Sequence, residues 1–308
     1  MKLSRILIVL AALAAGSVLA YTMPGATPYD GLITFDHGAM PLVPNALHIN
    51  GGIGYVMTSK GFNDDSEAVD LVDDLTLLAI PIDIGYAFDE RWRVDITPQL
   101  LRPAMGDTSV MGLGDLWVKT SAIWETAAGF YVGPRLGIKA PLGKTEDIDI
   151  PLGDKQMDID FAAIAAKYGE SAFKADAALG FRYRMKRTDT IEMGIPLASY
   201  DVDLTPGMMI YLDANLGMGL GGDQKWQIYV PVGFFTTMED KYTVGDDWPA
   251  NVTEPEGMSY MGVYAGLWPK YVIDENTNVG LKVEYPFMGK NTPQGMLVAL
   301  TADAFIPL

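Results

Sequence analysis

The chain has 308 residues, no cysteine and a formal net charge of −17 at pH 7. The lack of cysteine excludes disulfides, and such an acidic chain repels nucleic-acid phosphates, which excludes a nucleic-acid partner. After residues 1–20, no stretch of 18 consecutive apolar residues occurs, so a helical membrane protein is excluded as well.

The first 20 residues have the form of a secretory signal peptide. Lys2 and Arg5 give a basic start, residues 6–14 are apolar, and residues 18–20 offer a small-residue cleavage site. Residues 1–20 are therefore predicted to be removed on export. Either a soluble periplasmic or secreted protein or an outer-membrane barrel fits such a chain.

Residues 21–45 are rich in proline and glycine and show no regular alternation. Two interpretations of this irregular N-terminal segment remain open. It is either a periplasmic tail or a segment folded into the mouth of the domain that follows.

The clearest pattern lies between Gly112 and Gly143. Apolar and polar side chains alternate on both sides of a short turn at residues 125–129. Period-two alternation is typical of strands with one apolar and one polar face. Each strand spans roughly 11–14 residues, which is long for a soluble sheet and sufficient to cross a bilayer at a tilt. We interpret this segment as one hairpin of a transmembrane barrel, with its apolar face towards lipid.

Similar strand-like runs recur from residue 46 to the end of the chain. The twelve runs are 46–58, 75–88, 91–101, 111–125, 129–141, 157–168, 171–185, 207–220, 225–237, 258–270, 278–287 and 295–306. Their connections alternate between long and short, as the outer loops and periplasmic turns of bacterial barrels do. The predicted fold is all-β: one up-and-down antiparallel transmembrane β-barrel of about twelve strands over residues 46–308.

Charged side chains recur on the faces of these strands that would point into the lumen. The predicted pore-lining residues are Arg91, Arg93, Asp95, Asp115, Lys119, Arg135, Lys139, Lys174, Asp176, Arg182 and Arg184. Because unpaired buried charge is costly, these groups should either pair with one another or line water. A purely structural ion-pair network explains them equally well. The long connections 186–206 and 238–257 are candidate constrictions.

The hairpin and the strand after it also carry a family resemblance. Residues 112–115 are Gly-Leu-Gly-Asp, residues 139–143 are Lys-Ala-Pro-Leu-Gly, and residues 156–161 are Gln-Met-Asp-Ile-Asp-Phe. These segments resemble the MetA-pathway phenol-degradation family of outer-membrane proteins. The resemblance implies a barrel of similar size that passes small, often aromatic or apolar, compounds.

Motifs for catalysis are scarce. The chain has two histidines, His37 and His48, and neither has a serine at a recognisable catalytic spacing. Nucleotide-binding and metal-ligand motifs are lacking, so we expect no cofactor and no metal site. The protein is predicted not to be an enzyme, and a barrel hydrolase that uses His48 is the minor alternative.

These patterns predict an outer-membrane channel of a Gram-negative cell for passive uptake of small molecules. The alternative is a structural or surface-interaction barrel with a plugged lumen. The expected partners are a small-molecule solute, outer-membrane lipid and lipopolysaccharide. Divalent cations could bridge the acidic loops to lipopolysaccharide phosphates.

Overall fold

The computed structural model describes residues 44–143, 152–154, 156–168, 172–194, 197–245, 248 and 256–307. The strands are β1 (Ala46–Phe62), β2 (Ala68–Ala87), β3 (Trp92–Thr97), β4 (Gln99–Met105), β5 (Thr108–Ser109), β6 (Gly112–Leu113), β7 (Leu116–Ala122), β8 (Trp124–Glu125), β9 (Tyr131–Ala140), β10 (Asp158–Lys167), β11 (Phe173–Arg184), β12 (Arg187–Gly194), β13 (Leu197–Thr205), β14 (Met209–Leu220), β15 (Trp226–Thr237), β16 (Lys241–Val244), β17 (Met261–Asp274), β18 (Thr277–Lys290), β19 (Thr292–Pro293) and β20 (Met296–Pro307). Among the described residues, no helix has the length and apolarity to cross a bilayer.

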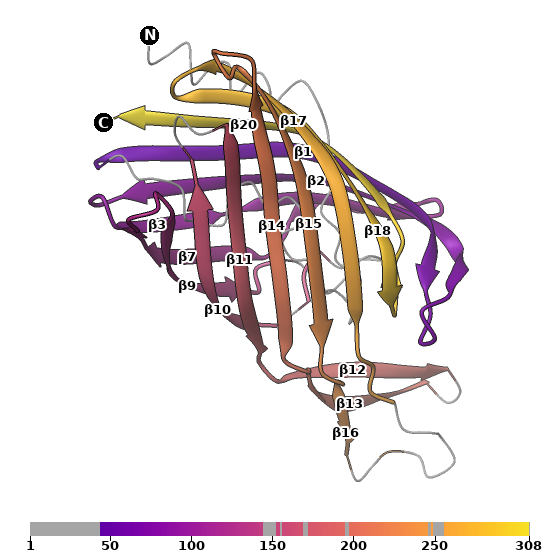
Figure 1. Ribbon diagram of the computed structural model, residues 1–308. Coiled ribbons are helices and arrows are strands. Elements are labelled where there is room, and N and C mark those ends of the chain that lie inside the picture. The colour runs from indigo at the N-terminus through magenta and orange to yellow at the C-terminus, as the bar shows by residue number, and fades with distance from the viewer. Residues whose placement is uncertain are drawn as a thin grey trace.

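Most of these strands form one closed antiparallel barrel with twelve spanning strands. Two spanning strands are interrupted: β3 and β4 together make one, and β5 to β8 make the next. The last strand, β20, pairs with β1 from Ala46 opposite Pro307 to Met57 opposite Met296, and this seam closes the barrel (Figure 1). The predicted all-β barrel fold is confirmed.

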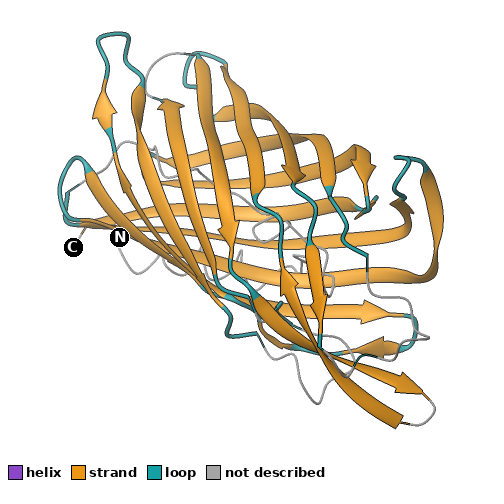
Figure 2. Cartoon of the chain, turned by 90° about the horizontal axis from the view of Figure 1, so that it is seen from below, coloured by secondary structure: helices purple, strands orange, loops and turns teal. Residues whose placement is uncertain are grey.

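The two ends of the barrel differ, as Figure 2 also shows from below. Short turns join β2 to β3, β14 to β15 and β17 to β18 at one end, where β20 also ends. We call this the turn end and the opposite one the loop end. At the loop end β1 and β2 continue to Phe62 and Ala68, so most of the predicted loop 59–74 is an extended hairpin.

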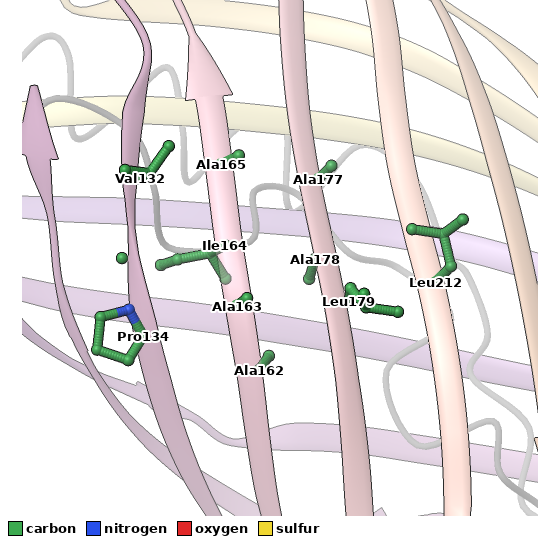
Figure 3. A pocket seen from close by; sticks show the side chains of 11 residues that line it. Val132, Pro134, Ala162, Ala163, Ile164, Ala165, Ala177, Ala178, Leu179 and Leu212 are labelled. Carbon is green, nitrogen blue, oxygen red and sulfur yellow. The ribbon is translucent and has the colours of Figure 1, made fainter. Parts of the chain in front are cut away.

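The wall has an exposed apolar outer face and a buried inner face. Along β11, Leu179 is 57% exposed and Phe181 is 43% exposed, whereas Asp176 is 1% exposed. Figure 3 shows a shallow apolar depression of about 570 Å³ on β9, β10, β11 and β14, where alanines separate Pro134 from Leu179. Apolar side chains facing outward all along the strands are what a barrel surrounded by lipid requires.

A small second sheet is built from the connections 186–206 and 238–257. In it β12 pairs with β13, with Arg187 opposite Leu204, and β13 pairs with β16. Figure 1 shows this three-stranded sheet beyond the loop end of β11, β14 and β15. The described parts of both connections therefore differ from the predicted constrictions, because they satisfy their backbone groups by pairing with each other outside the barrel.

Candidate channel interior

Most of the predicted pore-lining residues lie on the inward side of the wall, and Arg91 does not. Arg91 precedes β3 in an exposed turn, where the Asp89 carboxylate accepts hydrogen bonds from the backbone N–H groups of Arg91 (2.7 Å) and Trp92 (2.8 Å). These bonds hold the pKa of Asp89 below its ordinary value. The turn thus ends one residue later than predicted, and Arg91 lies at the turn end, outside the interior.

Near the turn end, Arg93 is the centre of a buried ionic group. Its Nε donates to the Asp95 carboxylate, and its Nη2 lies 3.5 Å from Asp83 Oδ2. Thr97 also donates its hydroxyl hydrogen to Asp83. Arg93 is 1% exposed, so this group compensates charge that could not otherwise be buried.

A second ionic group lies in the middle of the wall. Arg135 Nη2 is 3.1 Å from Asp160 Oδ1 and donates to Tyr211 Oη at 2.7 Å. The Tyr211 hydroxyl in turn donates to Asp160 at 2.9 Å. Arg182 approaches the other oxygen of Asp160 at 3.7 Å and lies 4.6 Å from the Trp117 ring centroid.

A third group lies nearer the loop end, around Lys139, whose side chain is 0% exposed. Lys139 Nζ donates to Asp154, lies 2.9 Å from Asp158 Oδ2 and lies 4.0 Å from Asp115 Oδ2. Asp115 also accepts the backbone N–H of Gly143 at 2.9 Å. Burial raises the pKa of Asp154, but the charge of Lys139 and its hydrogen bond outweigh this and lower it overall.

Through this third group, residues 152–154 of the connection between β9 and β10 are held inside the barrel. Leu152 is 3% exposed and packs against Ala79 of β2 and Leu101 of β4, both inward-facing. Because β2 and β4 are separated from β10 by other strands of the wall, the segment 152–154 reaches across the loop end of the lumen. The sequence analysis missed this constriction. The one signal was the short apolar run Ile150-Pro151-Leu152 in an otherwise polar connection.

The other predicted residues are distributed along the same inner face. Lys119 is half-buried and lies opposite Asp95 in the register of β3 and β7. On β11, Lys174 is buried, and Asp176 accepts a hydrogen bond from Asn215 Nδ2 at 3.3 Å. Arg184 lies 3.4 Å from Asp240, next to the small sheet.

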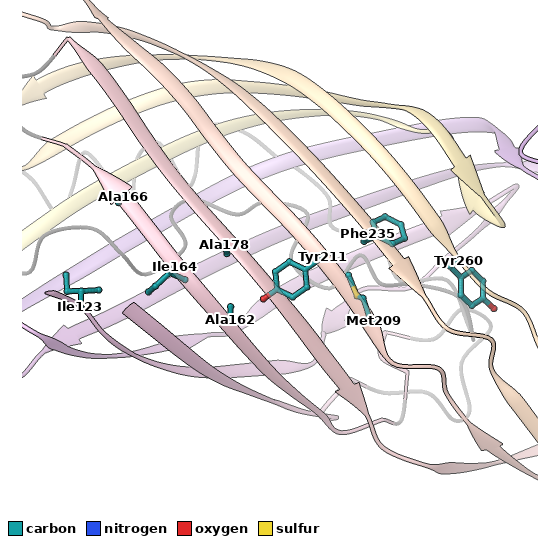
Figure 4. Packing of buried hydrophobic residues seen from close by; sticks show 9 residues of the cluster. All are labelled: Ile123, Ala162, Ile164, Ala166, Ala178, Met209, Tyr211, Phe235 and Tyr260. Carbon is teal, nitrogen blue, oxygen red and sulfur yellow. The ribbon is translucent and has the colours of Figure 1, made fainter. Parts of the chain in front are cut away.

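The inner face of β10, β11, β14 and β15 carries an apolar cluster between its charged residues, drawn in Figure 4. The buried cluster comprises Ile123, Ala162, Ile164, Ala166, Ala178, Met209, Tyr211, Phe235 and Tyr260. It forms because both inward and outward positions of β10 carry alanine, isoleucine or phenylalanine from Phe161 to Ala166. The sequence analysis assigned only charged residues to the lumen and therefore missed this apolar side.

Several aromatic rings on this side lie flat against the wall, over a glycine of the neighbouring strand. A Cβ added to Gly180 would come within 2.6 Å of the Tyr211 ring, and one on Gly233 within 2.0 Å of the Tyr264 ring. The same contact joins Tyr229 to Gly217 and Phe235 to Gly262. Glycine is required at these positions because any side chain would displace the ring.

His48 pairs with an acidic residue across the seam of the barrel. Its Nε2 lies 2.9 Å from Asp303 Oδ2, and its ring stacks on Phe305 with centroids 4.2 Å apart. The buried Ser121 lies on β7, three strands from β1 in the register, or about 14 Å at the usual strand spacing. The described residues contain no group of three or more His, Cys, Asp or Glu arranged to hold a metal ion.

Comparisons with known proteins agree on the fold. No family model matches the chain, and no curated protein matches it. Among solved structures, the COG4313 outer membrane channel from Pseudomonas putida F1 has a TM-score of 0.69 at 14% identity, covering 89% of this chain and 100% of that one. The translocator domain of autotransporter NalP from Neisseria meningitidis has a TM-score of 0.50 at 10% identity, covering 87% and 90%.

These likenesses agree with the closed wall of strands described above. The resemblance to the MetA-pathway family has no matching family model behind it. The comparisons support the fold of the chain and do not assign it to a family. The chain is a twelve-stranded outer-membrane β-barrel with the fold of outer-membrane channels.

Proposed function

We propose that this protein is an outer-membrane channel that takes up small molecules by passive diffusion. The observation that carries the proposal is the inward position of residues 152–154 at the loop end of the barrel, where Lys139 holds Asp154. A connection held inside a barrel wall narrows the passage and selects solutes by size. The channel fold of the Pseudomonas structure supports the same function.

The inner wall also indicates which solutes would pass. The arginines and lysines described above lie beside carboxylates. Their charges are compensated, so the interior does not favour ions of one sign. The apolar side of the wall offers contacts to uncharged apolar or aromatic bodies. We therefore propose small neutral solutes, including the aromatic compounds that the family resemblance implies.

The second candidate is a structural or surface-interaction barrel with a filled lumen. One observation favours it: inward-facing side chains are almost wholly buried, including Asn50 at 1% and Trp268 at 2% exposed. In this case acidic loops at the loop end would face partners or lipopolysaccharide, with divalent cations as bridges.

Two measurements test the channel function. Purified protein in planar bilayers should give discrete conductance steps, and liposomes containing it should swell in small neutral and aromatic solutes. Lys139→Ala should raise the conductance, because Asp154 loses the ammonium that holds the connection in place. Arg91→Ala, in the exposed turn, is the matched control and should leave it unchanged. A folded barrel without conductance or swelling contradicts the proposal.

A further inference from the structure

The outer face of the wall has a hollow that the channel function does not use. Outward positions of β10 and β11 carry only a methyl group at Ala163, Ala165 and Ala177. Val132 of β9 and Leu212 of β14 border this floor, and the hollow between them has a volume of about 570 Å³ (Figure 3). The hollow exists because small side chains on two adjacent strands lie between larger ones.

The hollow continues along the strands to a length that suits one leaflet of a bilayer. A second hollow of about 440 Å³, also lined by Ala163 and Leu179, extends it to the stacked rings of Phe161 and Phe181. We call the two hollows together the outer groove. The backbone from Phe161 to Lys167 spans about 20 Å along β10, or about 15 Å of membrane depth at the usual strand tilt. The hydrocarbon of one leaflet is also about 15 Å deep, so the groove has the length for one acyl chain.

A lysine lies at the turn end of the outer groove. Lys167 follows Ala163 and Ala165 on the outward side of β10. Its Nζ lies 4.5 Å from the centroid of the Phe130 ring and donates to Ala128 O at 3.0 Å. These contacts hold the ammonium beside the end of the groove. Within the described part of the chain no carboxylate pairs with it, so its charge is available to an anion on the outer surface.

Lys167 lies at the level where a bilayer has its phosphate groups. Trp124, which is 45% exposed, lies opposite Val132 near the same end of the wall, and exposed aromatic side chains mark the membrane interface. A lysine at this level attracts lipid phosphates. A second copy of the chain suits the groove less well. Two copies that met groove to groove across a two-fold axis would bring their Lys167 ammonium groups to the same level, where they repel.

We propose that the outer groove binds a glycerophospholipid of the periplasmic leaflet, which the turn end faces in bacterial barrels. One acyl chain lies over Ala163, Ala165 and Ala177, and the phosphate pairs with Lys167. Lipid around the rest of the wall meets neither the groove nor this lysine, so one lipid molecule is held longer than its neighbours. The site lies outside the lumen and goes beyond the proposed function, since a channel could conduct with or without it.

Native mass spectrometry of the delipidated barrel in detergent tests the phosphate contact. Dioleoyl phosphatidylglycerol is the probe, and dioleoylglycerol has the same chains without a phosphate. We expect one phospholipid to bind, with an affinity about fivefold higher than that of dioleoylglycerol. Lys167→Ala should remove this fivefold difference, and Lys167→Arg should restore it. Lys225→Ala removes an exposed lysine from the turn between β14 and β15 at the same end of the barrel; it is the matched control and should bind as the unmodified chain does.

A second pair of variants tests the groove itself. Ala177→Leu fills its floor with a side chain that points towards lipid, and it should weaken binding of the phospholipid about fivefold or more. Ala265→Leu adds the same side chain to the outward side of β17, away from the groove, and should leave binding unchanged. Glycerol 3-phosphate, which has the phosphate and no acyl chain, should not bind at the same concentrations.

The possible outcomes separate this site from the channel proposal. Equal binding by all variants, equal binding of both lipids, or no retained phospholipid overturns the site. A dimer that Ala177→Leu dissociates would mean that a second copy occupies the groove, which overturns it as well. If Ala177→Leu does not fold, Lys167→Ala changes only a surface side chain and still decides the phosphate contact. Conductance of the same samples in planar bilayers decides the channel function independently.

Discussion

The two sides of the inner wall solve the same packing problem with different chemistry. From β2 round to β9 the interior is built from ion pairs such as Arg93 with Asp95, and Lys139 of β9 with Asp158 of β10. In the middle of β10, β11, β14 and β15, between their charged residues, it is built from aliphatic groups and from rings laid over glycines. The first side depends on charge compensation and the second on steric fit, so different kinds of substitution should destabilise them.

The ionic side should show the largest effect. Arg93→Ala leaves Asp83 and Asp95 buried without their shared cation and should lower the free energy of unfolding by about 3–5 kcal/mol. Urea unfolding in detergent or lipid measures this change. Arg91→Ala should change it by less than about 0.5 kcal/mol. Equal effects at both positions would remove the distinction between turn and interior.

The apolar side should respond to added volume. In Gly233→Ala the new methyl group overlaps the Tyr264 ring, which must leave the wall. We expect the free energy of unfolding to fall by about 1–3 kcal/mol, which is typical of overpacking. Gly222→Ala meets nothing within 4 Å and serves as the control. If Gly233→Ala leaves the free energy of unfolding unchanged, the position of the ring does not depend on the glycine beneath it.

Tyr211 joins the two sides, since its ring lies over Gly180 and its hydroxyl contacts Arg135 and Asp160. Tyr211→Phe keeps the ring and removes only the hydroxyl. The free energy of unfolding should fall by about 1.5–3 kcal/mol, as expected for the loss of a hydrogen bond to charged partners. In a double-mutant cycle with Asp160→Asn, the two changes in the free energy of unfolding should not add. Full additivity would mean that the hydroxyl does not couple the two sides.

The smallest effect concerns pH. The pKa of Asp154 is lowered below 3.8 by Lys139 despite burial, so this contact is complete above pH 3.8 and is lost as pH falls through the lower value. Conductance should therefore be constant from pH 7 to 5 and rise only in stronger acid. A rise between pH 7 and 5 would show that another group holds the connection.

The sequence predicted the barrel well because period-two alternation is a local signal. The strand β11 shows this, with apolar side chains on one face from Phe173 to Tyr183 and four charged side chains on the other. The sequence did not predict that Tyr211 meets Gly180, because that contact depends on the register between β11 and β14.

Long connections were the weakest point for the same reason. Whether a loop enters the barrel is decided by contacts remote in sequence, such as Leu152 with Ala79. The connections 186–206 and 238–257 were chosen for their length. Their described parts pair with each other instead, and that pairing depends on β13 meeting β16 across about forty residues of chain.

The seam between β1 and β20 has a kinetic consequence. His48 and Asp303, which meet across it, are 255 positions apart in the chain. Such non-local pairing forms slowly, since most of the loop-closure entropy is lost before the contact is gained. Until β20 arrives, the edge of β1 stays open to pairing with other chains. The last exposed backbone edge of the wall therefore disappears only when the two ends of the domain meet.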